Sequence, residues 1–179
     1  MGRCMRIACL AWGSLVWKPG VLPVSDEWSG DGPRLPIEFS RVADGGELST
    51  AICLNAPSIP VLWTSLQVDS VAQACAALRQ REQIPPERED GVGWFIPSGS
   101  NVGELAEWAQ ARGIDAVIWT ALPPRIAGME NRLPSVEDAV DYLAGLTGDA
   151  CAHARHYIEQ VPAQIDTPYR RAIRHQLGW

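Results

Sequence analysis

A continuous apolar run near the start of the chain, closed by a glycine, constrains the fold more than any other feature of the sequence. Residues 7–12 read Ile-Ala-Cys-Leu-Ala-Trp, and Gly13 follows them. An unbroken apolar run of this length is typical of a strand buried on both faces, and glycine permits a sharp turn directly after it. We therefore expect a central strand that ends in a tight turn at Gly13.

The rest of the chain predicts short strands and helices that do not alternate regularly. Further strands are expected over residues 37–42, 48–54, 61–66 and 114–119, the first two joined by a hairpin turn at Asp44-Gly45-Gly46. Helices are expected from Ser70 to about Glu82, from Asn101 and Glu104 to Gly113, and from Ser135, about Asp149 and Thr167-Pro168. The Trp-, Pro- and Gly-rich segment 16–36 is expected to be an ordered loop. This order predicts an α+β fold with a mixed, partly closed, barrel-like sheet flanked by helices.

Length and composition limit the classes of function. At 179 residues the chain fits one domain, and its net charge of −6 argues against a nucleic-acid partner, which requires clustered Lys and Arg. No apolar run approaches the roughly 20 residues of a membrane helix, so no membrane partner is expected. The five cysteines are odd in number and form no C-x-x-C pair, which indicates free thiols in a reducing, cytoplasmic setting. The oligomeric state is left open.

Glu82 interrupts an otherwise apolar helix face. Val71, Cys75 and Leu78 follow the i, i+4, i+7 spacing, and Glu82 continues the same stripe at i+11. A carboxylate on a core-facing stripe is costly unless it is paired, and burial favours the protonated form that general acid–base catalysis uses. The alternative is an ordinary surface charge, paired with Arg79 or Arg81 or lying on a frayed helix end.

The turn after the first strand offers a binding group. Gly13 lets the backbone approach a ligand closely, and Ser14 adds a hydroxyl and an N–H group. Such a turn can hold a carboxylate or an oxyanion, although Gly-Ser after a strand is also a common structural turn.

Two motifs resemble a known family. Residues 12–20, Trp-Gly-Ser-Leu-Val-Trp-Lys-Pro-Gly, are similar to the Tyr-Gly-Ser-Leu-Ile-Trp-x-Pro-Gly motif of gamma-glutamyl cyclotransferases, especially the ChaC-type glutathione-degrading branch. The pair Arg81-Glu82, after the apolar stripe, resembles the Arg-Glu pair that carries the family's catalytic glutamate. The resemblance covers the first half of the chain, and Trp12 stands where the family usually has Tyr.

The resemblance implies one domain of this fold over residues 1–179, with a divergent helical part from about residue 91. It implies that Trp12, Gly13, Ser14 and Leu15 hold a small-molecule γ-glutamyl substrate and that Glu82 is the general acid/base. The substrate's α-amine would attack its own side-chain amide and release 5-oxoproline and an amine, with no cofactor or metal. A non-catalytic small-molecule binding module on the same fold is the alternative, and the identity of the amine is left open.

Three further groups of residues could carry a function. Arg41 follows an apolar alternation and is predicted to bind a substrate carboxylate, with a surface or barrel-rim arginine as the alternative. Cys151, His153 and His156 do not share one helical face, so no metal site is expected. A solvated face is expected for the small basic cluster near the C-terminus, formed by Arg170, Arg171 and Arg174.

Overall fold

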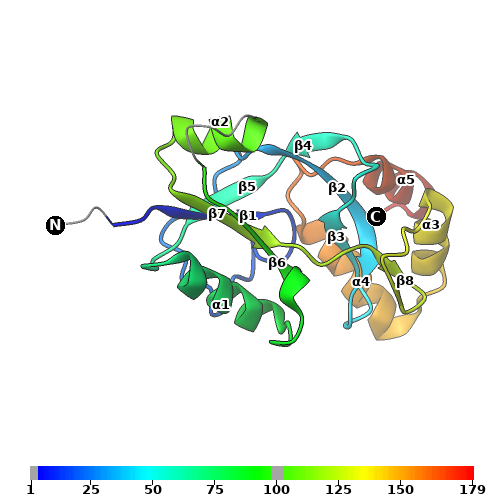
Figure 1. Ribbon diagram of the computed structural model, residues 1–179. Helices are drawn as coiled ribbons and strands as arrows, with labels where there is room; N and C mark the ends of the chain where they lie inside the picture. Colours follow the sequence, from blue (N-terminus) through cyan, green and yellow to red (C-terminus); the bar gives the residue numbers. More distant parts are fainter. Residues whose placement is uncertain (1–3, 98–102) are drawn as a thin grey trace. The chain divides into compact units, whose positions relative to one another are not determined.

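The computed structural model describes residues 4–97 and 103–179. The chain groups into two compact units, each with a sheet and helices (Figure 1). The first unit comprises Met1–Ala11, Lys18–Arg34 and Pro60–Leu122, and the second comprises Trp12–Trp17, Leu35–Ile59 and Pro123–Trp179. The expected α+β class with mixed sheets is confirmed, whereas the expectation of a single domain over residues 1–179 stays a prediction.

The apolar run forms a central strand of the first unit, as expected. Every residue of β1 (Ile7–Ala11) is buried. The sheet order is β5-β1-β7-β6, in which β1 pairs antiparallel with β5 (Leu62–Ser65) and parallel with β7 (Ala116–Thr120). The edge strand β6 (Val92–Phe95), which the sequence did not predict, runs antiparallel to β7.

Helix α1 (Val71–Glu82) packs against β6 and β7 and has the predicted bounds. Ser70 caps it by accepting a hydrogen bond from the Gln73 N–H at 3.1 Å, but the Gln73 side chain reaches back to the Asp69 N–H instead of Ser70. A 3-10 turn, η1 (Glu89–Gly91), precedes β6. Helix α2 (Glu104–Ala111) ends before Gly113 as expected, and its expected start at Asn101 lies outside the described residues.

The Trp-rich loop is ordered, as predicted. Isolated bridges join Val24 to Leu66 and Ser29 to Trp63, next to β5. The indole N–H of Trp63 donates to Asp31 Oδ1 at 2.7 Å, and the Trp63 and Trp108 rings meet edge to face at 5.3 Å. These contacts attach the loop to the first unit.

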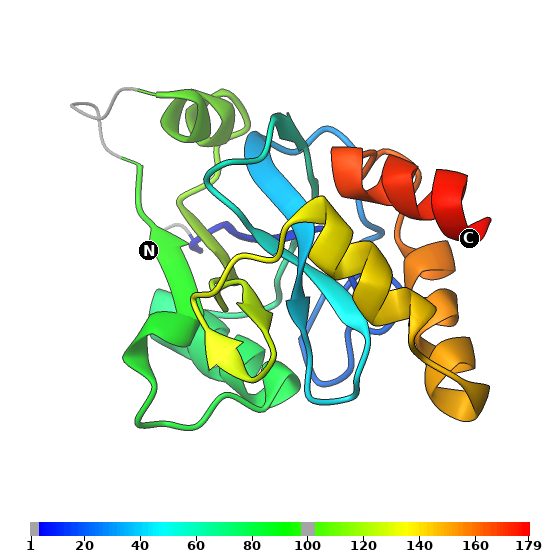
Figure 2. The ribbon, with the colours of Figure 1, turned by 90° about the vertical axis from the view of Figure 1, so that its right-hand side faces the viewer.

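The second unit has a five-stranded mixed sheet, curled as a half-barrel around the long, bent strand β2 (Figure 2). The order is β3-β2-β8-β9, and β4 also pairs with β2. The strands are β2 (Arg34–Val42), β3 (Leu48–Ile52), β4 (Ser58–Pro60), β8 (Arg125–Ile126) and β9 (Met129–Glu130). The predicted β2–β3 hairpin is present, with a bulge between Phe39 and Arg41 that the sequence did not predict. The strand expected over residues 48–54 ends at Ile52, so Leu54 lies beyond the end of β3 and is 88% exposed.

Three helices begin at or next to the predicted residues. They are α3 (Val136–Ala144), α4 (Gly148–Gln160) and α5 (Pro168–Leu177). Ser135 and Asp138 form a reciprocal capping box on α3, and Thr167 caps α5. Helix α4 packs against β3, and α3 packs against α5.

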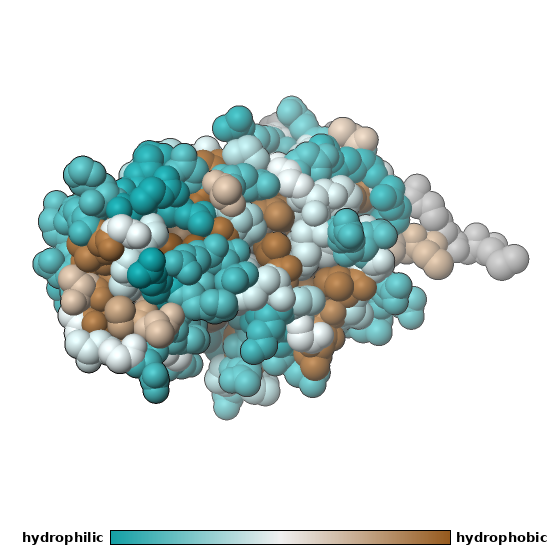
Figure 3. Space-filling view, turned by 180° about the vertical axis from the view of Figure 1, so that it is seen from behind, coloured by the Kyte–Doolittle hydropathy of each residue, from teal (hydrophilic) through white to brown (hydrophobic). Residues whose placement is uncertain are grey.

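The surface drawn in Figure 3 is mostly hydrophilic with separate apolar areas. Large exposed apolar side chains are scattered along the chain at Val21, Leu54, Trp94, Ile96 and Met129. Among the described residues, no helix has both the length and the apolar character needed to cross a membrane.

Candidate functional site

Glu82 is a largely buried carboxylate at the C-terminal end of α1. Its side chain is 17% exposed. Helix α1 packs against β7, and the Thr120 hydroxyl at the end of this strand donates to Glu82 Oε1 at 3.3 Å. The predicted core-facing position of Glu82 is therefore confirmed, and a hydroxyl accompanies the carboxylate.

The neighbouring Arg81 is also largely buried. Its side chain is only 15% exposed, and Nε and Nη2 donate to the Lys18 carbonyl at 3.0 and 2.7 Å. The contact to Glu82 Oε1 is longer, at 3.5 Å from Arg81 Nη1. The Lys18 loop covers this part of α1, so Arg81 and Glu82 are not the exposed surface pair of the alternative interpretation.

The carboxylate also affects a neighbouring strand. Burial raises the pKa of the Cys9 thiol on β1, and the negative charge of Glu82 raises it further. Cys9 is completely buried and stays protonated, so it is unsuited to act as a thiolate nucleophile.

The turn after β1 is held by its two apolar residues. Trp12 and Leu15 are each 5% exposed, while Ser14 is half-buried. The Val16 N–H donates to the Gly13 carbonyl at 3.0 Å and closes the turn. The predicted binding residues Trp12, Gly13, Ser14 and Leu15 thus lie in one rigid turn.

Thr50 and Tyr157 complete the surroundings of this turn, and the sequence predicted neither of them as a site residue. Thr50 Oγ1 on β3 donates to the Trp12 carbonyl at 3.1 Å and lies 3.1 Å from the Tyr157 hydroxyl. That hydroxyl also accepts from the Thr50 N–H at 3.2 Å. Trp17 meets the Tyr157 ring edge to face at 5.4 Å. A phenol from α4 therefore lies beside the turn, although Trp12 replaces the Tyr that the related motif carries.

The sequence around Tyr157 has the spacing of a buried helix face, but this pattern is not specific to a binding site. Tyr157 shares a buried helix face with Ala154, Ile158 and Val161. A tyrosine on such a face is usually a core residue whose hydroxyl needs one partner. Only the fold reveals that Thr50 and the turn supply its surroundings.

Arg41 is buried within the second unit near the end of β2, so it is not a surface arginine. Its Nη1 donates to the Pro123 carbonyl at 2.9 Å and its Nη2 pairs with Glu130 Oε1 at 3.0 Å. The bulge sets Arg41 opposite Ser49, whereas Phe39 is opposite Thr50. Because adjacent residues of a strand point to opposite faces, Arg41 and Thr50 lie on opposite faces of the hairpin. The structure therefore does not bring Arg41 to the turn.

The remaining clusters are structural or dispersed. Arg170 is buried and donates to the carbonyls of Pro162, Ile165, Ile158 and Val161. The expectation of a solvated basic face is therefore wrong for Arg170, because it caps the C-terminal end of α4.

No group of three His, Cys, Asp or Glu residues that could hold a metal ion occurs within residues 4–97 and 103–179. A hollow of about 540 Å³ near Ile96, Gln110 and Ile114 contains none of the predicted site residues.

Glu82 belongs to the first unit, and both the turn and Arg41 belong to the second. No protein-family model matches the chain, and a search of curated proteins finds no match either. The functional interpretation therefore depends on the residues and on the geometry within each unit.

Proposed function

We propose that this protein is a cofactor-free gamma-glutamyl cyclotransferase-type enzyme with Glu82 as its general acid and base. The observation that carries the proposal is the largely buried Glu82 carboxylate, whose side chain is 17% exposed at the end of α1. A carboxylate can take up a proton and return it, and one that is largely withdrawn from water can do so without competition from solvent. The Thr120 hydroxyl orients one carboxylate oxygen from 3.3 Å.

The turn has the properties needed to hold the γ-glutamyl group. Trp12 and Leu15 anchor it, and the missing side chain of Gly13 lets the Thr50 and Tyr157 hydroxyl groups lie against the turn. In the proposal, backbone N–H groups of the turn and the Ser14 hydroxyl bind the substrate's carboxylate and stabilise the oxyanion.

The reaction needs no nucleophile from the protein. The substrate's α-amine nitrogen forms a bond to the γ-carbonyl carbon, and the bond from that carbon to the amide nitrogen breaks. Glu82 takes a proton from the attacking nitrogen and delivers one to the leaving nitrogen, so 5-oxoproline and a free amine result without consumption of water. An intramolecular attack already has a high effective molarity, which leaves proton transfer and positioning to the protein.

Replacing Glu82 by Gln tests the proposal. The Glu82→Gln variant keeps the shape of the side chain but cannot exchange the proton, so kcat for 5-oxoproline release is expected to fall ~10²–10⁴-fold. Release from γ-glutamyl dipeptides and glutathione is followed by mass spectrometry. Glu87→Gln, an exposed position shortly after α1, is the matched control and should retain full activity. Equal rates for the Glu82→Gln variant and the wild type would exclude Glu82 as the proton carrier.

The non-catalytic binding module remains the second candidate, and Trp12 favours it because this side chain lacks the hydroxyl of the related motif. A γ-glutamyl compound at about 100 times its Kd would then stabilise the fold by roughly 2.7 kcal/mol. Stabilisation without any 5-oxoproline would support the module over the enzyme.

A further inference from the structure

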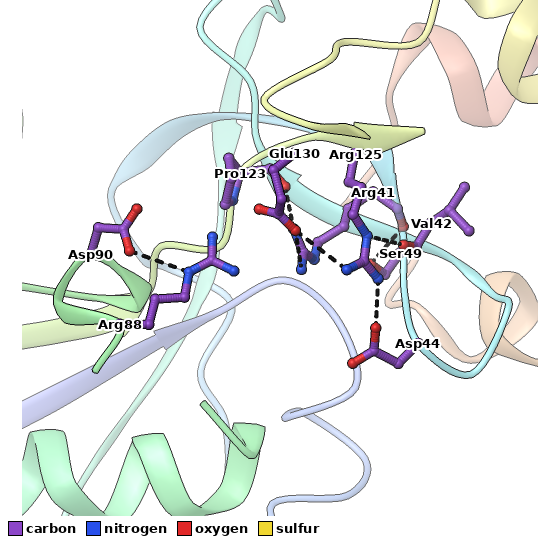
Figure 4. A network of polar contacts seen from close by, with 9 residues as sticks. All are labelled: Arg41, Val42, Asp44, Ser49, Arg88, Asp90, Pro123, Arg125 and Glu130. Atoms are coloured by element: carbon purple, nitrogen blue, oxygen red, sulfur yellow. Dashed lines mark hydrogen bonds and ion pairs between the residues drawn. The ribbon is translucent and has the colours of Figure 1, made fainter. Parts of the chain in front are cut away.

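Two arginines of the second unit share one carboxylate oxygen. Arg41 on β2 is paired in register with Arg125 on β8, and Figure 4 shows both guanidinium groups directed at Glu130. Arg41 Nη2 lies 3.0 Å from Glu130 Oε1, and Arg125 Nη1 lies 3.3 Å from the same atom. Two cations therefore converge on one point.

Backbone carbonyl groups fix both guanidinium groups independently of Glu130. Arg41 Nη1 donates to the Pro123 carbonyl and Arg125 Nε donates to the Val42 carbonyl, each at 2.9 Å. The side chains of Arg41 and Arg125 are only 9% and 19% exposed. The cationic pair is thus preorganised and largely withdrawn from water.

The negative partners are much more exposed than the arginines. Glu130 has a side chain that is 34% exposed, and it belongs to the hairpin β8–β9, which has only two residue pairs. Asp44 pairs with Arg125 at 2.8 Å but is 97% exposed, so water screens its charge strongly. A buried guanidinium needs an anion, and here a short surface hairpin supplies it.

We propose that Arg41 and Arg125 form a binding site for the carboxylate group of a small ligand, and that Glu130 occupies this site when the ligand is absent. Glu130 itself shows that the pair accepts a carboxylate. An incoming carboxylate takes the place of Glu130 on both guanidinium groups and accepts charge-assisted hydrogen bonds from them. The site is separate from the turn at Gly13, because Arg41 and Thr50 lie on opposite faces of the hairpin.

Succinate binding to the full chain tests this site. Affinity is measured by isothermal titration calorimetry at constant ionic strength, with NaCl replacing succinate in the reference. The Glu130→Gln variant has a neutral side chain that competes less for the arginines, so it should bind succinate about tenfold more tightly than the wild type. The Arg125→Gln variant should lose this binding.

Controls separate the site from a general charge effect. Glu137→Gln makes the same charge change at an exposed position on α3 and should leave the affinity at the wild-type value. Glu130→Asp, which shortens the competing side chain, provides a second variant if Glu130→Gln does not fold as judged by circular dichroism. The proposal is overturned if the Glu130 variants bind succinate no more tightly than the wild type, if Glu137→Gln gains as much, or if none of the proteins binds succinate.

Discussion

A Cβ atom on Gly13 would lie 2.5 Å from Thr50 Oγ1 and 2.6 Å from the Tyr157 hydroxyl. These hydroxyl groups are held by β3 and α4, so they cannot retreat easily. Gly13→Ala is therefore expected to lower the free energy of unfolding by about 1–3 kcal/mol, as overpacking does at other buried sites. Urea unfolding followed by circular dichroism measures the change.

Gly145→Ala is the matched control for this substitution. Its nearest contact would be an ordinary 3.5 Å, and its φ of −81° suits alanine. If Gly13→Ala lowers the free energy of unfolding no more than Gly145→Ala does, this result would contradict the close contact of the turn with Thr50 and Tyr157.

At the residue scale, the sequence predicted where Glu82 lies but not what surrounds it. Helical spacing is a local property, so the stripe from Val71 to Glu82 could be read along the chain. The contacts of Arg81 with Lys18, and of Tyr157 with Thr50, join residues 63 and 107 positions apart. No local pattern encodes such pairs, so neither contact could be predicted from the sequence.

At the scale of elements, Glu38 ties strand β2 to the start of α5. The carboxylate is 2% exposed and accepts hydrogen bonds from the Thr167 hydroxyl at 2.5 Å, the Phe39 N–H at 2.9 Å and the Tyr169 N–H at 3.3 Å. Burial nevertheless raises the pKa of Glu38 above its ordinary value, because desolvation outweighs these hydrogen bonds.

The raised pKa of Glu38 determines how stability changes with pH. The folded state binds the proton more tightly than the unfolded chain, so the stabilisation from this group is present below the unfolded pKa of about 4.3. It is lost as the pH rises through the folded-state pKa. Relative to the wild type, the Glu38→Gln variant should therefore gain stability as the pH increases from about 4 to 8. Urea unfolding at several pH values measures this difference, and a difference that stays constant or falls with pH would contradict the assignment.

Capping residues made the helices more predictable than the strands. Ser70, Ser135 and Thr167 each cap a helix at the predicted place, because the cap is encoded within three residues. The strands β8 and β9 have two residues each and are stabilised by pairing with distant segments, so no period-2 pattern marks them. The bulge in β2 was missed for the same reason, and it determines which face Arg41 occupies.

At the scale of the whole molecule, the chain divides into two units with different contents. The first unit contains Glu82 and Thr120, and the second contains the turn, Thr50 and Tyr157. The α+β class followed from the irregular order of strands and helices, whereas the grouping into two units depends on contacts between distant segments and was not predicted.

Product analysis in water enriched with oxygen-18 tests the central claim most directly. Cyclisation uses the substrate's own amine, so incubation with γ-glutamyl dipeptides should yield unlabelled 5-oxoproline together with an equal amount of released amine. Hydrolysis would instead place one solvent oxygen in the γ-carboxylate of glutamate. Mass spectrometry distinguishes the two products. Unlabelled 5-oxoproline is the predicted result, and labelled glutamate, or no amine from any γ-glutamyl substrate, would contradict the account.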